Sequence, residues 1–194
     1  MSAEQQAKSL LRQQLRATRR ALSAKTRTAA ATAIAGLAGT LPGWNDTQHI
    51  ALYWPNDGEL DPKPLAKHCR NEQRYLYLPT LSDDNRLLFR RWDANTQLVP
   101  NRFGIPEPES CSPQRKAAQM DVIFMPLVGW RRDGYRLGMG GGFYDRTLAG
   151  LTGPLRVGLG FTCQEIKHST AAEPWDVALD YVLTEAGLVC CATG

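Results

Sequence analysis

The sequence has 194 residues, of which 43% are hydrophobic and 22% charged, and its formal net charge is +4. These values are typical of an ordinary globular protein, disfavour disordered and fibrous classes, and fit one domain over residues 1–194. No apolar run approaches the roughly 18 to 20 residues that a membrane-spanning helix needs, and the chain begins polar and then basic, so we expect a cytoplasmic protein without a membrane partner.

Residues 3–21 contain strong helix formers with leucines at helical spacing, which predicts an amphipathic helix. Lys8, Arg12 and Arg16 recur every four residues and therefore share one face of it. Taken alone, such a row of cations is expected to face water. A basic start to the chain also suits an anionic partner, which could be a nucleotide, a folate-like carboxylate or nucleic acid. Ser23 is a predicted N-cap for a second, alanine-rich helix.

Residues 49–54 predict a short buried strand that ends at the turn over 55–58. The acid Glu59 follows directly, and a helix is predicted over 62–73. In open α/β sheets, a strand followed by a loop with an acid and then a helix places functional groups at the carboxyl ends of the strands. By itself, however, an isolated acid such as Glu59 is more typical of a turn or cap than of a binding site.

Two further strands, 74–81 and 87–92, are predicted to form a hairpin. Residues 93–119 contain four prolines and predict a long ordered connection, a kind of loop that is commonly functional. The near-continuous apolar run over 121–130 predicts a central strand covered on both faces. Strands at 156–161 and, last in the chain, at 181–184 complete the pattern. This alternation predicts a three-layer α/β fold with a mixed, mostly parallel sheet and helices on both faces.

A glycine-rich loop follows the central strand, with the sequence Arg136-Leu137-Gly138-Met139-Gly140-Gly141-Gly142-Phe143-Tyr144-Asp145-Arg146. Glycine costs a helix or strand interior roughly 0.5 to 1 kcal/mol relative to alanine, so four glycines in five positions indicate a need for bare backbone. A tight turn alone usually needs only one or two of them. A glycine-rich junction between strand and helix exposes N–H groups that bind phosphate. We therefore predict a ligand-binding loop, although it has neither P-loop nor dinucleotide-fingerprint spacing.

Three acids, Asp145, Asp176 and Asp180, are candidate magnesium ligands, because magnesium takes one or two carboxylates together with waters and phosphate oxygens. For Asp180 we favour a surface or capping role. Most aromatic residues are expected in the core, but Trp54 and Phe143 lie beside the loops described above and could stack on a flat heterocycle. Histidine clusters and nucleophile elbows are absent from the sequence, so covalent hydrolase chemistry has no support.

The segments Pro126–Trp130 and Arg136–Arg146 closely resemble the signature of the 5-formyltetrahydrofolate cyclo-ligase family, also called methenyltetrahydrofolate synthetase. The likeness covers nearly the whole chain, since further family segments occur in the family's order: Lys8-x-x-x-Arg12, Gly58–Asp61, Phe103–Pro108 and Trp175-Asp176. The resemblance implies ATP- and magnesium-dependent conversion of 5-formyltetrahydrofolate to 5,10-methenyltetrahydrofolate with release of ADP and phosphate. The formyl oxygen would be phosphorylated first, and ring closure would follow. The resemblance also implies an α/β fold with a mixed sheet.

The same resemblance implies a role for each candidate residue. ATP and its phosphates would be bound by Lys8, Arg12 and the loop Arg136, Leu137, Gly138, Met139, Gly140, Gly141, Gly142, Phe143 and Tyr144. The catalytic groups among them would be Lys8, Arg12, Arg136 and Tyr144. The folate would lie against Trp54, Glu59, Phe143 and Tyr144, and magnesium would be held by Asp145 and Asp176.

Two positions depart from the family pattern. Many members carry a lysine or arginine in the loop where this chain has Met139 and Gly141, so the cations must come from Arg136, Arg146 or the N-terminal helix. Trp175 stands where a small or polar residue often precedes the aspartate, which weakens the assignment of Asp176 relative to Asp145.

Two alternatives stay open. A non-catalytic nucleic-acid-binding module could use the basic N-terminal helix, but the small net charge and the lack of an RNA or DNA motif stand against it. A different ATP-dependent ligase or kinase could use the same fold. We expect a monomer whose partner is a small-molecule folate, polyglutamylated or not.

Overall fold

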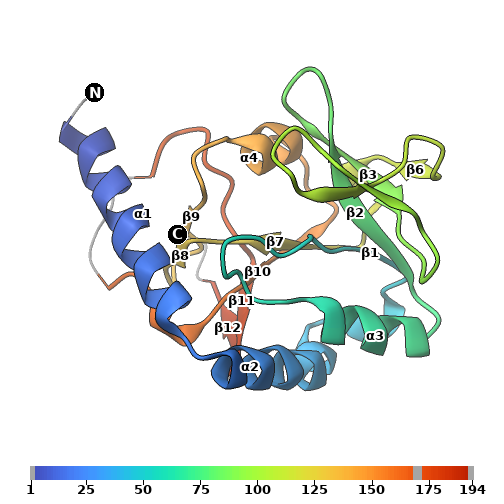
Figure 1. Ribbon diagram of the computed structural model, residues 1–194, viewed down its shortest axis with the longest axis horizontal. Coiled ribbons are helices and arrows are strands. Elements are labelled where there is room, and N and C mark those ends of the chain that lie inside the picture. Colours follow the sequence, from blue (N-terminus) through green and yellow to red (C-terminus); the bar gives the residue numbers. More distant parts are fainter. Residues whose placement is uncertain (1–2, 168–171, 192–194) are drawn as a thin grey trace.

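The computed structural model describes residues 3–167 and 172–191 (Figure 1). Its largest element is an eight-stranded sheet with the order β12-β11-β10-β7-β1-β2-β3-β6. The strands are β1 (His49–Ala51), β2 (Tyr75–Leu81), β3 (Leu87–Arg91), β6 (Gln114–Arg115), β7 (Val122–Pro126), β10 (Leu155–Leu159), β11 (Tyr181–Thr184) and β12 (Gly187–Cys190). The four inner pairings are parallel and the three outer ones antiparallel, which confirms the mixed, mostly parallel sheet.

Helices lie on both faces of this sheet (Figure 1). One face is covered by α2 (Ala24–Leu37) and α3 (Lys63–Asn71), and the other carries α4 (Phe143–Leu148). Four short 3₁₀ helices, η1 (Ala38–Thr40), η2 (Trp44–Asp46), η3 (Ala117–Gln119) and η4 (Thr162–Gln164), occur between the other elements. Within the described part of the chain, no helix has the length and apolar character needed to cross a membrane.

The N-terminal helix α1 (Ala3–Ala21) lies beside these layers rather than in one of them (Figure 1). It packs Leu11 and Leu15 against a small cluster that contains Val128, Leu137 and Ile166. Its predicted bounds are confirmed. The predicted N-cap of α2 is confirmed as well, because the Ser23 side chain accepts a hydrogen bond from the Thr26 N–H.

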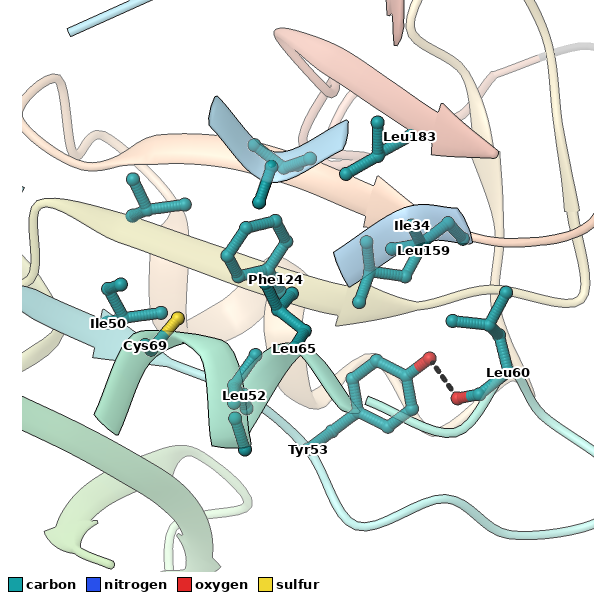
Figure 2. Packing of buried hydrophobic residues seen from close by; sticks show 14 of the residues in the cluster. Ile34, Ile50, Leu52, Tyr53, Leu60, Leu65, Cys69, Phe124, Leu159 and Leu183 are labelled. Carbon is teal, nitrogen blue, oxygen red and sulfur yellow. Dashed lines mark hydrogen bonds between the residues drawn. The ribbon is translucent and has the colours of Figure 1, made fainter. Parts of the chain in front are cut away.

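The main hydrophobic core lies between the sheet and the α2–α3 layer (Figure 2). Figure 2 shows Ile34 of α2 and Leu65 of α3 near Phe124 of β7, and all three are fully buried. Burial of one such side chain contributes about 1.5 to 3 kcal/mol. The Tyr53 hydroxyl donates a 2.8 Å hydrogen bond to the Leu60 carbonyl, so the loop after β1 is tied to this core.

Strand β7 is covered on both faces, as the apolar run predicts. Val122 and Phe124 point into the main core, whereas Ile123 and Met125 point into a second cluster on the α4 side. The strand is shorter than the predicted 121–130, however, because it ends at Pro126. Beyond it, the Gln164 amide donates to the carbonyls of Leu127 and Val128, which takes these groups out of the sheet.

The next residues form a separate hairpin in which β8 (Gly129–Trp130) pairs with β9 (Arg136–Leu137). The long connection before β7 is ordered, as expected, but it also contains β4 (Leu98–Pro100), β5 (Pro106–Pro108) and β6. The prediction that β11 is the last strand is wrong. A short turn with Gly187 at φ 138° brings β12 back antiparallel to β11.

Candidate active site

A cavity of about 1440 Å³ opens where the parallel strands β1, β2 and β7 end. Every residue predicted to bind nucleotide, substrate or metal lines it: Lys8, Arg12, Trp54, Glu59, Arg136, Leu137, Gly138, Met139, Gly140, Gly141, Gly142, Phe143, Tyr144, Asp145 and Asp176. Cavities for a single small ligand usually measure roughly 300 to 1,000 Å³. This cavity therefore has room for two ligands side by side.

The basic face of α1 forms one wall of the cavity. The Lys8 ammonium donates a 2.8 Å hydrogen bond to Glu173, and Arg12 Nε donates one of 2.9 Å to the Gly138 carbonyl. Lys8 is only 7% exposed, so the expectation that these cations face water is wrong. Burial lowers the pKa of Lys8, but the bond to Glu173 and nearby negative groups outweigh it and raise that pKa overall. Lys8 is therefore positively charged in the cavity wall.

The glycine loop contributes bare backbone and the buried cation Arg136. Gly140 and Gly142 have φ of 98° and 65°, a region that favours glycine. Arg136 Nη2 donates a 2.8 Å hydrogen bond to Asp145 Oδ1. Its buried Nε, by contrast, has no hydrogen-bond partner among residues 3–167 and 172–191. A buried cationic donor of this kind suits an anionic ligand at the loop.

Asp145 and Asp176 are connected through the loop that follows residue 171. The Val177 N–H donates to Asp145 Oδ1 at 3.2 Å, and Asp176 Oδ2 accepts from the Glu173 N–H at 2.9 Å. Trp175, the residue before Asp176, lines the cavity and is 68% exposed. The described residues contain no group of three or more metal-binding side chains. Two carboxylates nevertheless fit magnesium, which takes most of its other ligands from water and phosphate.

The other two charged candidates have structural partners. Asp180 accepts from Arg156 Nε and Nη2 at 3.0 and 2.7 Å and lies outside the cavity wall, in agreement with the structural role favoured for it. Arg146 donates to the carbonyls of Gly141 and Asn85. It therefore connects the glycine loop to the turn of the β2–β3 hairpin, at the cavity wall.

Glu59 also lines the cavity and is fixed by its own turn. Its Oε2 accepts a 3.0 Å hydrogen bond from the Asn56 N–H. Burial raises the pKa of Glu59, and this hydrogen bond and the charge of Arg19 only partly oppose the rise. Glu59 is thus a partly desolvated carboxyl group facing a ligand-sized space.

Aromatic rings also line the cavity. Trp54 packs edge-on against Trp92, with ring centroids 6.1 Å apart, and Phe143 meets Phe103 in the same way at 6.0 Å. Burial raises the pKa of the Tyr144 hydroxyl far above its ordinary value. Tyr144 is therefore a neutral hydrogen-bond donor near neutral pH.

One group of cavity residues was not predicted from the sequence. Asp57, at the tip of the turn before Glu59, is bound by Arg16, Arg19 and Arg20 of α1. Glu173, the partner of Lys8, was missed as well. The only sequence signal for Asp57 is its place beside Gly58 in a turn, and nothing in the sequence indicates partners that lie 37 to 41 residues away.

The fold and the cavity together are those of an α/β protein with a candidate ligand site at the carboxyl ends of parallel strands. The sequence profile of the 5-formyltetrahydrofolate cyclo-ligase family matches residues 4–185. The chain therefore belongs to this family, as the signature at residues 126–146 indicated.

Individual relatives agree with this assignment. The chain is 38% identical over 141 residues to a 5-formyltetrahydrofolate cyclo-ligase of Haemophilus influenzae, which covers 70% of this chain and 75% of that protein. It is 37% identical over 142 residues to the one of Escherichia coli K12, with 70% and 76% covered. The fold is similar to the NMR structure of Aquifex aeolicus 5,10-methenyltetrahydrofolate synthetase, with a TM-score of 0.82 and 30% identity over 96% of this chain and 94% of that one. A 5,10-methenyltetrahydrofolate synthetase from Mycoplasma pneumoniae gives a TM-score of 0.74 at 27% identity, covering 92% and 98%.

Proposed function

We propose that this cyclo-ligase family member converts 5-formyltetrahydrofolate to 5,10-methenyltetrahydrofolate in a reaction that depends on ATP and magnesium and releases ADP and phosphate. The observation that carries the proposal is the single cavity that joins the α1 cations, the glycine loop, two carboxylates and the Trp54–Glu59 loop. Its volume supports two substrates bound next to each other.

The nucleotide would lie along α1 and the glycine loop. Lys8, Arg12 and Arg136 supply positive charge, and the backbone of residues 140–142 supplies N–H groups for phosphate oxygens. Arg136 Nε has no hydrogen-bond partner among the described residues, which supports an anionic ligand next to this side chain. Asp145 and Asp176 would hold magnesium, which, when bound, neutralises charge on the phosphate oxygens.

The folate would lie on the other side. Glu59 would accept hydrogen bonds from N–H groups of the pterin, and Trp54 and Phe143 would stack on its flat rings. The neutral hydroxyl of Tyr144 would donate to a substrate oxygen. These contacts would hold the formyl group close to the terminal phosphate of the nucleotide.

In the proposed reaction, the formyl oxygen attacks the terminal phosphorus of ATP, and the bond from that phosphorus to the ADP oxygen breaks. The second folate nitrogen then attacks the formyl carbon and loses its proton. The carbon–oxygen bond breaks and phosphate leaves. Positioning and charge stabilisation dominate phosphoryl transfer, which is the work that Lys8, Arg12 and Arg136 can do.

The orientation of α1 also bears on the nucleic-acid alternative. Lys8 and Arg12 bond to Glu173 and Gly138 in the cavity wall, which supports a small anion over a nucleic-acid surface.

The deciding experiment follows methenyl product by absorbance after 5-formyltetrahydrofolate, ATP and magnesium are added, with ADP measured in parallel. We expect both products in equal amounts. Release of ADP without methenyl product would favour another ATP-dependent ligase or kinase, and the absence of both would overturn the proposal. A salt-sensitive RNA gel shift that Lys8→Ala and Arg12→Ala abolish would favour the nucleic-acid alternative.

A further inference from the structure

A cluster of ion pairs that the reaction above does not use connects α1 to the loop between β1 and α3. Asp57 Oδ2 accepts hydrogen bonds from Arg16 Nε at 2.7 Å and from Arg19 Nη2 at 2.8 Å, and Arg20 binds the other carboxylate oxygen. The Asp57 side chain is only 10% exposed. One carboxylate thus anchors three guanidinium groups of the same helix.

Arg19 is the buried centre of this cluster, with no exposed surface at all. Its Nε donates to the Asp57 carbonyl at 3.0 Å, and its Nη1 donates to the Leu127 carbonyl, just beyond β7, at 3.1 Å. The planar guanidinium has five donors in a fixed arrangement, so these bonds define its orientation. Arg19 therefore fixes α1 against two cavity-forming segments at once.

The turn that carries Asp57 also fixes Glu59. Asp57 has a φ of 53°, and its N–H donates to the Asn56 side chain at 2.8 Å. The Glu59 N–H donates to the Asn56 carbonyl at 2.9 Å, while the Glu59 carboxylate accepts from the Asn56 N–H. A Cβ atom placed on Gly58 would lie 3.5 Å from Arg20 Cγ, so the turn lies directly against α1. A shift of Asp57 would therefore move Glu59 with it.

The other end of the same helical face carries the nucleotide-side cations. Lys8 and Arg12 precede Arg16 by two turns and one turn of helix, and α1 is continuous between them. A continuous helix transmits its rotation and axial position along its length. The contact at Asp57 therefore also determines where Lys8 and Arg12 stand relative to the glycine loop.

We infer that Asp57 is a positioning residue that, through Arg16 and Arg19, fixes the nucleotide-side cations of α1 and the folate-side Glu59 relative to each other. In this role Asp57 acts through the helix and the turn, not by contact with the reacting atoms. The inference rests on the proposed function for the identity of the two substrates, but the connection between helix and turn rests on the contacts alone.

The test uses the full-length enzyme with Asp57→Asn, which keeps the shape of the side chain and removes its charge. We expect the KM values for ATP and for 5-formyltetrahydrofolate both to rise about tenfold, with kcat changed far less, because misplaced binding groups weaken both substrates. Two reference variants each affect one side: Arg12→Ala should raise mainly the KM for ATP, and Glu59→Gln mainly that for the folate. Asp57→Glu, which keeps the negative charge, should have KM values for both substrates close to those of the wild type.

The control is Asp121→Asn, since the Asp121 carboxylate also accepts hydrogen bonds from a distant segment, in this case from the backbone N–H groups of Gln48 and His49, but at the opposite end of the sheet. It should leave both KM values unchanged. An Asp57→Asn variant that alters only one KM, or that lowers Tm with both KM values unchanged, would overturn the inference.

A readout independent of turnover is hydrogen exchange. In Asp57→Asn, the amides of α1 and of residues 56–60 should lose protection together, whereas in Asp121→Asn they should not. Loss of protection in only one of the two segments would contradict the connection. If the wild-type enzyme forms no methenyl product, the proposed function fails, while the exchange experiment still decides whether Asp57 connects the helix to the turn.

Discussion

Replacing Asp145 with asparagine removes the charge of this side chain while keeping an oxygen in the same place. That oxygen can still accept from Arg136 Nη2 and from the Val177 N–H, the two donors that now bind Oδ1 at 2.8 and 3.2 Å. What disappears is the ion pair between two largely buried side chains, which are 7% exposed for Arg136 and 17% exposed for Asp145.

The loss of stability follows from this geometry. Hydrogen bonds to charged groups contribute about 1.5 to 3 kcal/mol, so we expect the free energy of unfolding to fall by about 1 to 3 kcal/mol. For a chain of this length each kcal/mol lowers Tm by roughly 2 to 4 °C, which gives a decrease of about 2 to 12 °C in thermal unfolding.

The effect on activity is separate. If Asp145 binds magnesium, the magnesium concentration for half-maximal methenyl formation should rise about tenfold or more, since even outer-shell partners of metal ligands change affinity 10- to 100-fold. The assay is a magnesium titration at saturating ATP and folate. A wild-type magnesium dependence in Asp145→Asn would refute the reasoning and would show that the metal is held elsewhere.

Asp180→Asn is the matched control. It removes the charge from a carboxylate that accepts three hydrogen bonds from Arg156, two from the guanidinium and one from the backbone N–H, so Tm should fall by a similar amount. Because Asp180 lies outside the cavity wall, the magnesium dependence should stay unchanged. A shift in magnesium dependence for Asp180→Asn, with none for Asp145→Asn, would indicate that Asp180 holds the metal and that Asp145 has only a structural role.

Three further predictions concern the two sides of the cavity. Glu59→Gln should weaken folate binding in calorimetry more than ATP binding, and an equal loss of both would indicate a folding defect. Burial raises the pKa of Glu59 above its ordinary 4.5, so the folded state holds this proton more tightly than the unfolded state. The wild-type free energy of unfolding, measured in urea, should therefore fall as pH rises from 4.5 through the raised pKa, and Glu59→Gln should lack that decrease. Gly140→Ala should destabilise the protein by about 1 to 3 kcal/mol and also raise the KM for ATP, because φ is 98° beside Arg12. Gly43→Ala, at φ 71° with nothing within 4 Å of the added Cβ, should destabilise it without changing that KM.

Features with local causes could be predicted from the sequence. The Ser23 cap acts on the Thr26 N–H three residues away, and the turn over residues 82–85 closes the β2–β3 hairpin through the Asn85 N–H and the Ser82 carbonyl. The alternation of Phe124 and Met125 between two cores likewise follows from the period of a strand. In such cases the residues that form the structure stand next to each other in the chain.

Features that depend on distant partners could not be predicted in this way. The row of cations on α1 looks like a water-facing surface because the acids that pair with it, Asp57 and Glu173, lie in other segments. The end of β7 depends in the same way on the Gln164 side chain, 36 and 37 residues away. For the site, the family resemblance was sufficient to collect the lining residues, but it did not show which of them bind each other.

The contact between Lys8 and Glu173 joins residues 165 positions apart. During synthesis, α1 leaves the ribosome long before residue 173 does, so this contact cannot form until the segment with Glu173 has been made. Contacts of such high sequence separation form late and slow the folding of small proteins. The wall of the cavity that contains Lys8 is therefore completed late, so a chain released before residue 173 would contain the glycine loop but lack the acid that binds Lys8.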